Sequence, residues 1–390
     1  MNSVPAKFLL FTWLFAAFTV TASASEGPVY KIVSQSPLSG PQSAIGEAIK
    51  FGAQLALEDF GPSAGVQISL QPEDDQATPN VGVANANRII NDPQVLGVVA
   101  HYNSGVTIPA SEVYAKVSLA AVSPAATNPV VTDRESTRAV MNRVCGRDDI
   151  QGPAAADFAY DDLKARKIYV INDKTAYGAG LAQAFEAEMK KKGGQIMVSA
   201  GVDDKETDFS PILNRAMLDR PDLIFYGGYY PQAALLIKQL KQKRLKAKLI
   251  GGDGLDSADL QKVAGADNMQ DVYFTTTSVP ISKLPAAAQF ASVYKSKFGK
   301  DPEGYAAYGY DAAHALILAI SQAAQAAKGA PTRAAVAAAL RTVSFDGLTG
   351  HVEFNSHGDI KSAKYVAIAA GKDAASNEVV KVIDVAAPGN

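Results

Sequence analysis

The sequence contains little cysteine and histidine and has no excess of basic charge. Its 390 residues include 1 cysteine and 4 histidines, and 37 Lys and Arg stand against 39 Asp and Glu. This near balance argues against a nucleic-acid-binding protein, which normally carries a basic excess. A lone cysteine excludes an internal disulfide. Because Cys145 closes an apolar run, we expect it to be a small buried side chain.

Signatures of catalysis and cofactor binding are also missing. The sequence has no GxxxxGK[ST] loop, no HExxH, no CxxC and no GxSxG elbow, and its histidines lack metal-ligand spacing. The run from Tyr177 to Gly180 begins like a dinucleotide loop but lacks the third glycine. The pairs Asp74-Asp75 and Asp148-Asp149 are candidate acids and bases, although adjacent acids at strand ends are more often turn and cap residues. We therefore expect a binding protein without cofactor or metal, and not an enzyme.

The only long apolar run lies at the N-terminus. Lys7 precedes an apolar run from Phe8 to Val20, and the segment ending at Ala24 has the small-x-small pattern that signal peptidase recognises. The run is about 13 residues long, whereas a membrane-spanning helix needs about 20. We predict a cleaved signal peptide over residues 1–24 and a soluble mature protein in the periplasm. No cysteine follows the run, which argues against a lipoprotein; a retained anchor is the alternative.

Short apolar segments alternate with longer helical patterns along most of the chain. Strands that are apolar on both faces and alternate with helices predict parallel sheets covered on both sides. The expected strands are 29–35, 66–70, 95–100, 117–122, 167–172, 195–202, 223–226, 248–251 and 272–276. The expected helices between them are 44–59, 81–91, 109–115, 153–164, 179–192, 209–218 and 231–243.

The strands are too many for one open sheet, which favours two α/β lobes divided near Arg147 to Gly152. From about Pro285 the sequence becomes rich in alanine and in helical patterns, at 306–327 and 332–341, before short β-type segments at 351–354, 364–369 and 379–385. Because the first lobe lacks covering helices, we predict that the chain crosses back. Lobe 1 then comprises residues 25–148 plus about 277–353, and lobe 2 comprises 149–276 plus about 354–386.

Ligands of open α/β sheets bind beyond the carboxyl ends of the strands. In lobe 1, Ser104 and Thr127 lie there, at or near predicted helix N-termini, where free backbone N–H groups and the helix dipole favour an anion. Either residue alone is explained as an ordinary N-cap. Two such turns on adjacent strands favour a site for a ligand carboxylate.

In lobe 2, Asp253 follows a strand and is flanked by glycines. A carboxylate in that position suits a ligand ammonium group. The alternative is a helix N-cap for residues 257–263, for which Asp256 or Ser257 is better placed. Tyr177 and Tyr229, at other strand ends, have the apolar faces and polar tips of cleft-wall residues. Together the two lobes offer what is needed to hold an α-amino acid.

At these residues the chain resembles the periplasmic leucine/isoleucine/valine-binding proteins, the type I substrate-binding proteins of ABC transporters. The resemblance covers essentially the whole mature chain and rests on the order and spacing of several short segments. It implies two Rossmann-like lobes with parallel sheets, joined by three crossing segments, which close on the ligand like a Venus flytrap. The segments are 39–41, 101–107, 123–127, 149–153, 173–178 and 226–229.

The resemblance also implies roles for individual residues. Ser104, Ala125 and Thr127 match positions that hold the α-carboxylate and part of the ammonium group. Asp253 matches the acidic position that binds the ammonium, and it is one methylene shorter than the Glu of the leucine-binding members. Two further residues match cleft aromatics that contact the ligand from the second lobe: Tyr177 and Tyr229.

The chain departs from the family pattern near the ligand side chain. The family's tyrosine after Ser-Gly-Pro aligns with Ile45, and the two cysteines of its first-lobe disulfide align near Ala77 and Asn103. Tyr102 and Asn103 line the side-chain end of the pocket in place of apolar or sulfur groups. The clamp for the amino-acid backbone is therefore better preserved than the side-chain pocket.

We expect the solute-binding component of an ABC transporter, a monomer that carries a branched-chain or other apolar amino acid to an inner-membrane permease. A sensory module that reports to a chemoreceptor or kinase has the same sequence features. A binder of aromatic acids, amides or urea derivatives is another alternative, although Asp253 would oppose a plain carboxylic acid. A secreted enzyme would need a nucleophile–base pair, and none is evident.

Overall fold

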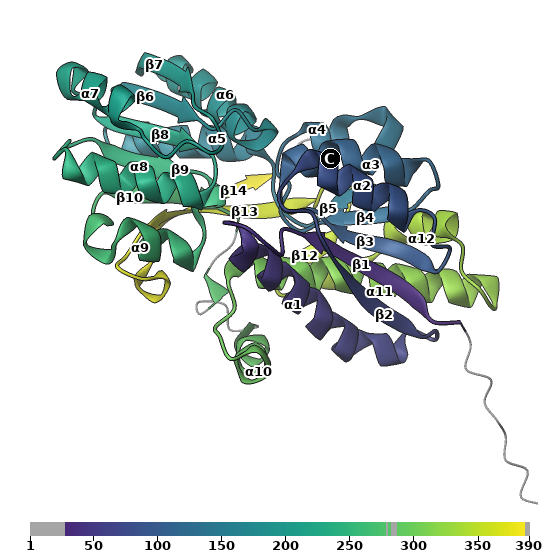
Figure 1. The fold of residues 1–390 in the computed structure, drawn as a ribbon. Coiled ribbons are helices and arrows are strands. Elements are labelled where there is room, and N and C mark those ends of the chain that lie inside the picture. The colour runs from purple at the N-terminus through teal and green to yellow at the C-terminus, as the bar shows by residue number, and fades with distance from the viewer. Residues whose placement is uncertain (1–27, 278–279, 282–286, 387–390) are drawn as a thin grey trace, which may run out of the picture.

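The structure is a computed structural model that describes residues 28–277, 280–281 and 287–386 (Figure 1). The predicted signal peptide, residues 1–24, lies outside the described residues. Two β-sheets with helices packed on them form two lobes that meet at the centre of the molecule (Figure 1). Within the described ranges, no helix combines the length and apolar character that a membrane crossing requires.

Lobe 1 is built on a five-stranded parallel sheet with the order β2-β1-β3-β4-β5. Its strand β3 is buried along its whole length, as expected for a strand with helices on both faces. β5 is missing from the predicted strands, because three residues are too few for an apolar pattern to identify a strand. The strands are β1 Tyr30–Ser36, β2 Ile68–Asp74, β3 Val95–Ala100, β4 Ala120–Ser123 and β5 Met141–Arg143.

Two helices from late in the chain cover this sheet. α11 and α12 contact β3 and β4, which confirms the prediction that the chain crosses back. α11 packs closely on α1 because glycines at the contact have no side chain. A Cβ at Gly52 would lie 1.9 Å from the Ala306 carbonyl oxygen, and a Cβ at Gly309 would lie 2.3 Å from the Ile49 carbonyl oxygen. The helices around lobe 1 are α1 Ser43–Phe60, α2 Pro79–Ile89, α3 Ser104–Ala115, α4 Val130–Asp133, α10 Ala288–Phe298, α11 Gly304–Ala327 and α12 Arg333–Leu340.

Lobe 2 contains a seven-stranded sheet with the order β14-β13-β10-β9-β8-β6-β7. β6 to β10 are parallel, whereas β13 and β14 run antiparallel at one edge. The short link between those two strands permits only antiparallel pairing. The strands are β6 Lys167–Asn172, β7 Gln195–Gly201, β8 Leu223–Gly227, β9 Lys248–Gly251, β10 Val272–Thr276, β13 Ser362–Ala369 and β14 Glu378–Ala386; the helices are α5 Asp148–Asp157, α6 Ala176–Lys191, α7 Ser210–Asp219, α8 Tyr230–Gln242 and α9 Ala258–Ala264.

The chain passes between the lobes three times. It leaves the first sheet after β5, returns after β10 towards α10 and α11, and crosses again between the hairpin β11–β12 and β13. In Figure 1 the yellow ribbon of β13 and β14 runs from the junction into lobe 2. The hairpin consists of β11 Ser344–Asp346 and β12 His351–Glu353.

Two helices begin five residues earlier than predicted. α3 begins at Ser104 and contains Pro109, and α5 begins at Asp148 and contains Pro153. Both predicted ranges begin at the proline, which is common in the first turn of a helix. The prolines lie inside the helices instead, so that the polar residues before them, and not the prolines, form the helix N-termini at the lobe junction.

Candidate ligand-binding site

Asp253 lies buried at the junction of the lobes, in a 3₁₀ turn (Asp253–Leu255) that follows β9. Its Oδ1 accepts a hydrogen bond from the Tyr177 hydroxyl at 2.8 Å, and its Oδ2 accepts one from the Tyr305 hydroxyl at 2.6 Å. Burial raises the pKa of Asp253, and the two hydroxyl donors oppose that rise. The Ser257 side chain caps α9, so Asp253 is not the N-cap of that helix.

Four tyrosine rings pack around this carboxylate. The ring centroids of Tyr177 and Tyr229 are 5.0 Å apart, those of Tyr102 and Tyr229 5.4 Å, and those of Tyr102 and Tyr305 5.3 Å. They come from α6, the residue before α8, the end of β3 and the first turn of α11. The structure therefore brings together the predicted Tyr102, Tyr177 and Tyr229, and it adds Tyr305, whose only sequence signal is its place at the start of the alanine-rich helix.

The loops of lobe 1 supply hydroxyl and backbone groups. Ser104 is the first residue of α3, and its Oγ accepts a hydrogen bond from the Asn128 N–H at 3.2 Å. The Ala125 N–H donates to Ser123 Oγ at 3.2 Å. Thr127 precedes α4, which has only four residues. The expected helix N-terminus is thus confirmed at Ser104. A helix also begins near Thr127, but it is a single turn and contributes little dipole.

The lobes touch across the junction. The Tyr230 hydroxyl of lobe 2 donates to the Pro41 carbonyl of lobe 1 at 2.6 Å. Asn128 Nδ2 donates in the other direction, to the Ala176 carbonyl at 2.7 Å. A Cβ at Gly180 would lie 2.7 Å from Asn128 Nδ2, so a larger residue there would displace the Asn128 side chain from its hydrogen bond to Ala176. The structure is that of a closed two-lobed protein.

We expect Tyr230→Phe to weaken ligand binding by about two- to tenfold, because the lost hydrogen bond exists only when the lobes are closed. Calorimetric titration of the ligand-stripped variant measures this change. Tyr169→Phe is the matched control, since the Tyr169 hydroxyl bonds Asp219 within lobe 2 and takes no part in closure. Equal affinities of Tyr230→Phe and the wild type would contradict this role.

Several buried polar atoms around the junction make no well-formed hydrogen bond within the described part of the chain. Asn103 illustrates this: its Nδ2 donates to Gln42 Oε1 at 2.8 Å, but its Oδ1 has no partner. Buried polar groups are normally satisfied, so a group of exceptions is expected where a polar ligand supplies the missing partners. The atoms are Tyr102 Oη, Asn103 Oδ1, Thr127 Oγ1, Gln151 Oε1 and both carboxylate oxygens of Asp148.

The acid pairs noted in the sequence have different roles. Asp74 accepts backbone hydrogen bonds from Leu38 and Gln76, as predicted for a turn residue. Asp149 bonds Arg147 and is partly exposed. For Asp148 the interpretation as a turn or cap residue is wrong, because its side chain is buried and makes no capping hydrogen bond. Cys145 is buried, as predicted.

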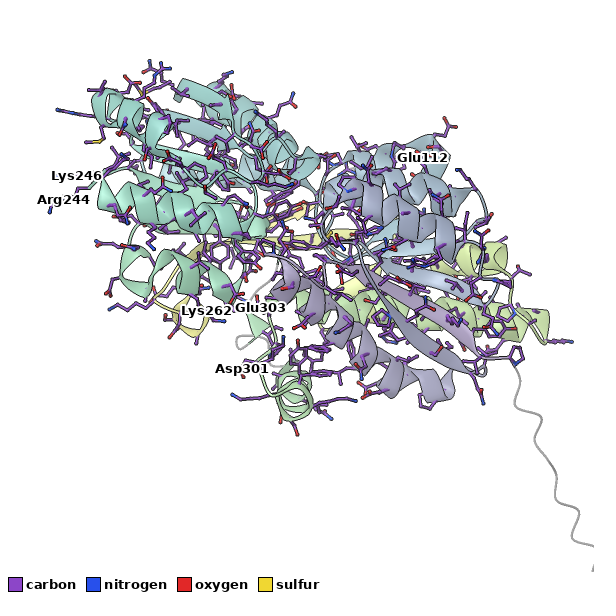
Figure 2. The ribbon with its side chains drawn as sticks, viewed as in Figure 1. Glu112, Arg244, Lys246, Lys262, Asp301 and Glu303 are labelled. Carbon is purple, nitrogen blue, oxygen red and sulfur yellow. The ribbon has the colours of Figure 1, made fainter. Side chains whose placement is uncertain are left out.

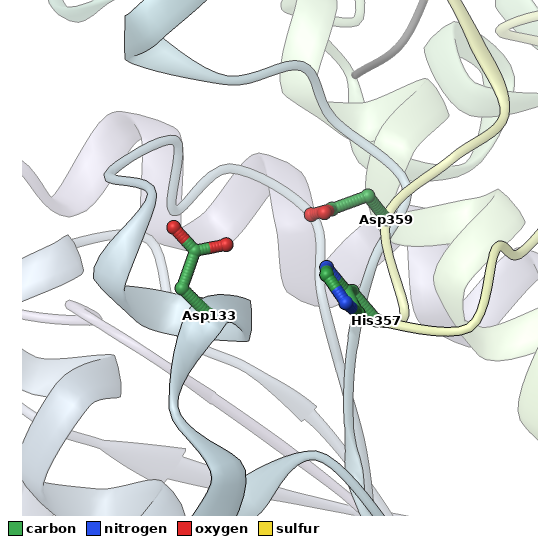
Figure 3. Close-up of side chains that lie close together, drawn as sticks. All are labelled: Asp133, His357 and Asp359. Atoms are coloured by element: carbon green, nitrogen blue, oxygen red, sulfur yellow. The ribbon is translucent and has the colours of Figure 1, made fainter. Parts of the chain in front are cut away.

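Below the site, two arginines bind the acidic residues of a cluster near the crossing segments. Asp133, His357 and Asp359 place one potential metal-ligating atom each within 4.8 Å of the others (Figure 3). However, Asp359 Oδ1 accepts from Arg143 Nε at 2.6 Å and its Oδ2 from Arg147 Nη1 at 2.9 Å. Arg147 also bonds Asp133. Since the guanidinium groups already neutralise the carboxylates, the cluster is a structural ion-pair network.

Two cavities lie away from the tyrosine cluster. One, of about 1080 Å³, is lined by Tyr30, Leu57 and Lys328 at the outer end of lobe 1. The other, of about 900 Å³, lies beside α9 and α10, where Figure 2 shows Lys262, Asp301 and Glu303. Neither includes any of the predicted site residues.

These features define a two-lobed α/β protein with a candidate site between the lobes. The chain belongs to the periplasmic binding protein family, whose profile matches residues 29–373. It is 33% identical over 333 residues to an amino acid binding protein of Pseudomonas aeruginosa, covering 85% of this chain and 87% of that protein. It is 35% identical, with the same coverage, to Leu/Ile/Val-binding protein homolog 1 of Brucella abortus.

Solved structures show the same architecture. A leucine-binding protein of Thermotoga maritima superposes with a TM-score of 0.83 at 31% identity, covering 91% of this chain and 99% of that one. A solute-binding protein of R. palustris in complex with benzoate has a TM-score of 0.81 at 19% identity, covering 92% and 97%. At that identity the likeness shows the fold alone. The predicted fold class and the family resemblance are confirmed.

Proposed function

We propose that the protein binds an amino acid between its lobes and delivers it to the permease of an ABC transporter. The observation that carries this proposal is Asp253, a buried carboxylate at the junction that accepts hydrogen bonds from two tyrosine hydroxyls. Among the described residues, no cationic side chain bonds it. Such a carboxylate suits a ligand ammonium group. Leucine- and amino-acid-binding relatives above 30% identity support the assignment.

The opposite end of the ligand faces lobe 1. Ser104 begins a helix of 12 residues, whose first N–H groups favour an anion. The buried Thr127 hydroxyl makes no well-formed hydrogen bond with the described residues. We assign the ligand carboxylate to Ser104, Ala125 and Thr127, and the ammonium group to Asp253.

The ligand side chain points towards Tyr102 and Asn103 in this proposal. The faces of Tyr102 and Tyr305 supply apolar surface, which suits a branched-chain or other apolar side chain. An aromatic acid is the second candidate, because solute-binding proteins of the same fold have been solved with benzoate and with 3,4-dihydroxybenzoic acid. The buried Asp253 favours an amino acid, since a plain acid would bring a second anion without a cation.

Closure follows from the ligand's contacts with both lobes. An open protein holds the ligand carboxylate on lobe 1, and rotation about the three crossing segments brings Tyr177, Tyr229 and Asp253 against it. The ligand shifts the equilibrium only by the contacts that it gains in the closed form. In this proposal the protein is exported to the periplasm, is a monomer and has no enzymatic activity. Its closed form docks on the permease.

A thermal-shift screen of the ligand-stripped protein tests the proposal. Ligands that bind only the folded state raise the melting temperature by mass action. We expect shifts with apolar amino acids and none with benzoate, amides or urea; shifts confined to ligands without an ammonium group would overturn the assignment. Uptake of the identified amino acid by a strain lacking the gene separates transport from sensing, because a transporter component is needed for uptake and a sensor is not.

A further inference from the structure

Asp148 is a buried acid for which the described residues provide few partners. It is the first residue of α5, at the segment where the chain enters lobe 2, and its exposed fraction is 1%. Its backbone N–H donates to the Thr127 carbonyl at 2.9 Å, but neither carboxylate oxygen makes a well-formed hydrogen bond with the described residues. The next residue, Asp149, bonds Arg147 at the surface.

Arg143, the cationic side chain whose charge acts on Asp148, already binds other groups. Arg143 Nε bonds Asp359 at 2.6 Å, and Arg143 Nη1 donates to the carbonyls of Ala126 and Asn128 at 2.9 and 3.0 Å. Within the described ranges, Asp148 therefore has no ion-pair partner of its own. Burial, and then the charge of Asp253, raise the pKa of Asp148, while the nearby Thr127 hydroxyl lowers it.

Asp148 and Asp253 are both buried, and their charges interact. Their hydrogen-bond partners differ. Asp253 accepts hydrogen bonds from two tyrosine hydroxyls, whereas Asp148 has only the Thr127 hydroxyl near it, without a well-formed hydrogen bond. Two carboxylates in one buried site cannot both ionise unless a cation joins them. The missing component is a group with positive charge and several N–H donors.

We propose that Asp148 is a second ligand-binding carboxyl group, which holds the ammonium group of the ligand together with Asp253. This inference rests on the proposed function and narrows it: the ligand carries a primary ammonium group, whose three N–H donors can serve both carboxylates. An N-methylated amino acid, with one donor fewer, should bind more weakly than its parent. Loss of the amino group removes both contacts.

Binding is then linked to a proton. In this proposal, one of the two acids carries a proton when no ligand is bound. When the ammonium group enters, that proton leaves to solvent and both carboxylates face the cation. The ligand's own bonds are unchanged, and charge balances because one positive charge enters as another departs. Several titratable or charged groups interact electrostatically with Asp148, so that the charge of one shifts the pKa of the other. They are Arg143, Cys145, Asp149, Tyr177, Tyr229, Asp253 and Tyr365.

The test compares Asp148→Asn with the adjacent Asp149→Asn as matched control. Each ligand-stripped protein is titrated calorimetrically with the amino acid that the wild type binds, in two buffers of different ionisation heat at pH 7. We expect the wild type and Asp149→Asn to release a proton on binding. We expect Asp148→Asn to release none and to bind at least tenfold more weakly, while unfolding at a temperature no lower than the wild type.

The outcomes separate the two proposals. If the wild type binds no amino acid, the proposed function fails before any variant is compared. If the wild type binds without releasing a proton, or if Asp148→Asn keeps wild-type affinity, only the role of Asp148 is overturned. Asp148→Ser is the second variant. If neither variant protein folds, Asp148 is needed for folding, and that result would also overturn the inference.

Discussion

Asp253→Asn is expected to weaken binding of the amino acid by tens-fold or more. The substitution keeps the shape of the side chain but removes the charge that faces the ligand ammonium group. Losing one member of a buried charge pair costs on the order of 2–5 kcal/mol. Calorimetric titration of the ligand-stripped variant measures the change in Kd, and the accompanying thermal unfolding curve shows whether the fold is intact.

Asp256→Asn is the matched control for this experiment. Asp256 is a partly buried acid in the loop after β9; it accepts a hydrogen bond from Thr276, and no hydrogen bond from the tyrosine cluster is seen among the described residues. We expect its affinity to stay within about twofold of the wild type, as for a substitution that removes no ligand contact. Equal losses in both variants would point to a general disturbance of the loop and contradict a specific role for Asp253.

Asp359→Ala is expected to lower the free energy of unfolding by about 3–5 kcal/mol, because it leaves the buried Arg143 guanidinium without its counter-ion. The Thr132 hydroxyl also loses its acceptor. Urea unfolding followed by circular dichroism measures the change. The control is Asp133→Ala, whose carboxylate bonds Arg147 but is about half exposed; we expect a loss of less than about 1 kcal/mol.

The same network predicts how stability depends on pH. Burial alone would raise the pKa of Asp359, but Arg143 and Arg147 outweigh it and hold the pKa below the ordinary value of 3.8. A depressed pKa in the folded state contributes stability that is present above 3.8 and is lost as the pH falls through the folded value. Acid should therefore destabilise the wild type more than Asp359→Ala. An equal acid response of both proteins would contradict the ion pair.

The sequence was sufficient for the architecture because both sheets follow from apolar periodicity. The segments Val95–Ala100 and Lys167–Asn172 are strands with the predicted bounds, since buried parallel strands have continuous apolar sequences. The two missed helix starts have a physical reason: Pro109 and Pro153 break the pattern that defines a helix, although α3 and α5 run through them.

The sequence predicts the site residues that follow strands, but not those that reach the site from segments far away in the chain. Asp253, Tyr177 and Tyr229 each follow a strand, and parallel strands end at one edge of a sheet. Tyr305 reaches the site from a helix that returns to lobe 1, and no local pattern distinguishes it from other residues of α11. The sequence predicts a turn or cap role for Asp148, because its burial appears only in three dimensions.

We expect the closed junction to recognise an ammonium group. The most direct test titrates ligand-stripped wild-type protein with the amino acid found in the screen, with the corresponding acid lacking the amino group, and with the corresponding amine lacking the carboxylate. We predict that the amino acid binds at least tens-fold more tightly than either analogue, because each analogue lacks the charged group that one of the lobes binds. Binding of the deaminated acid as tightly as the amino acid would contradict the account.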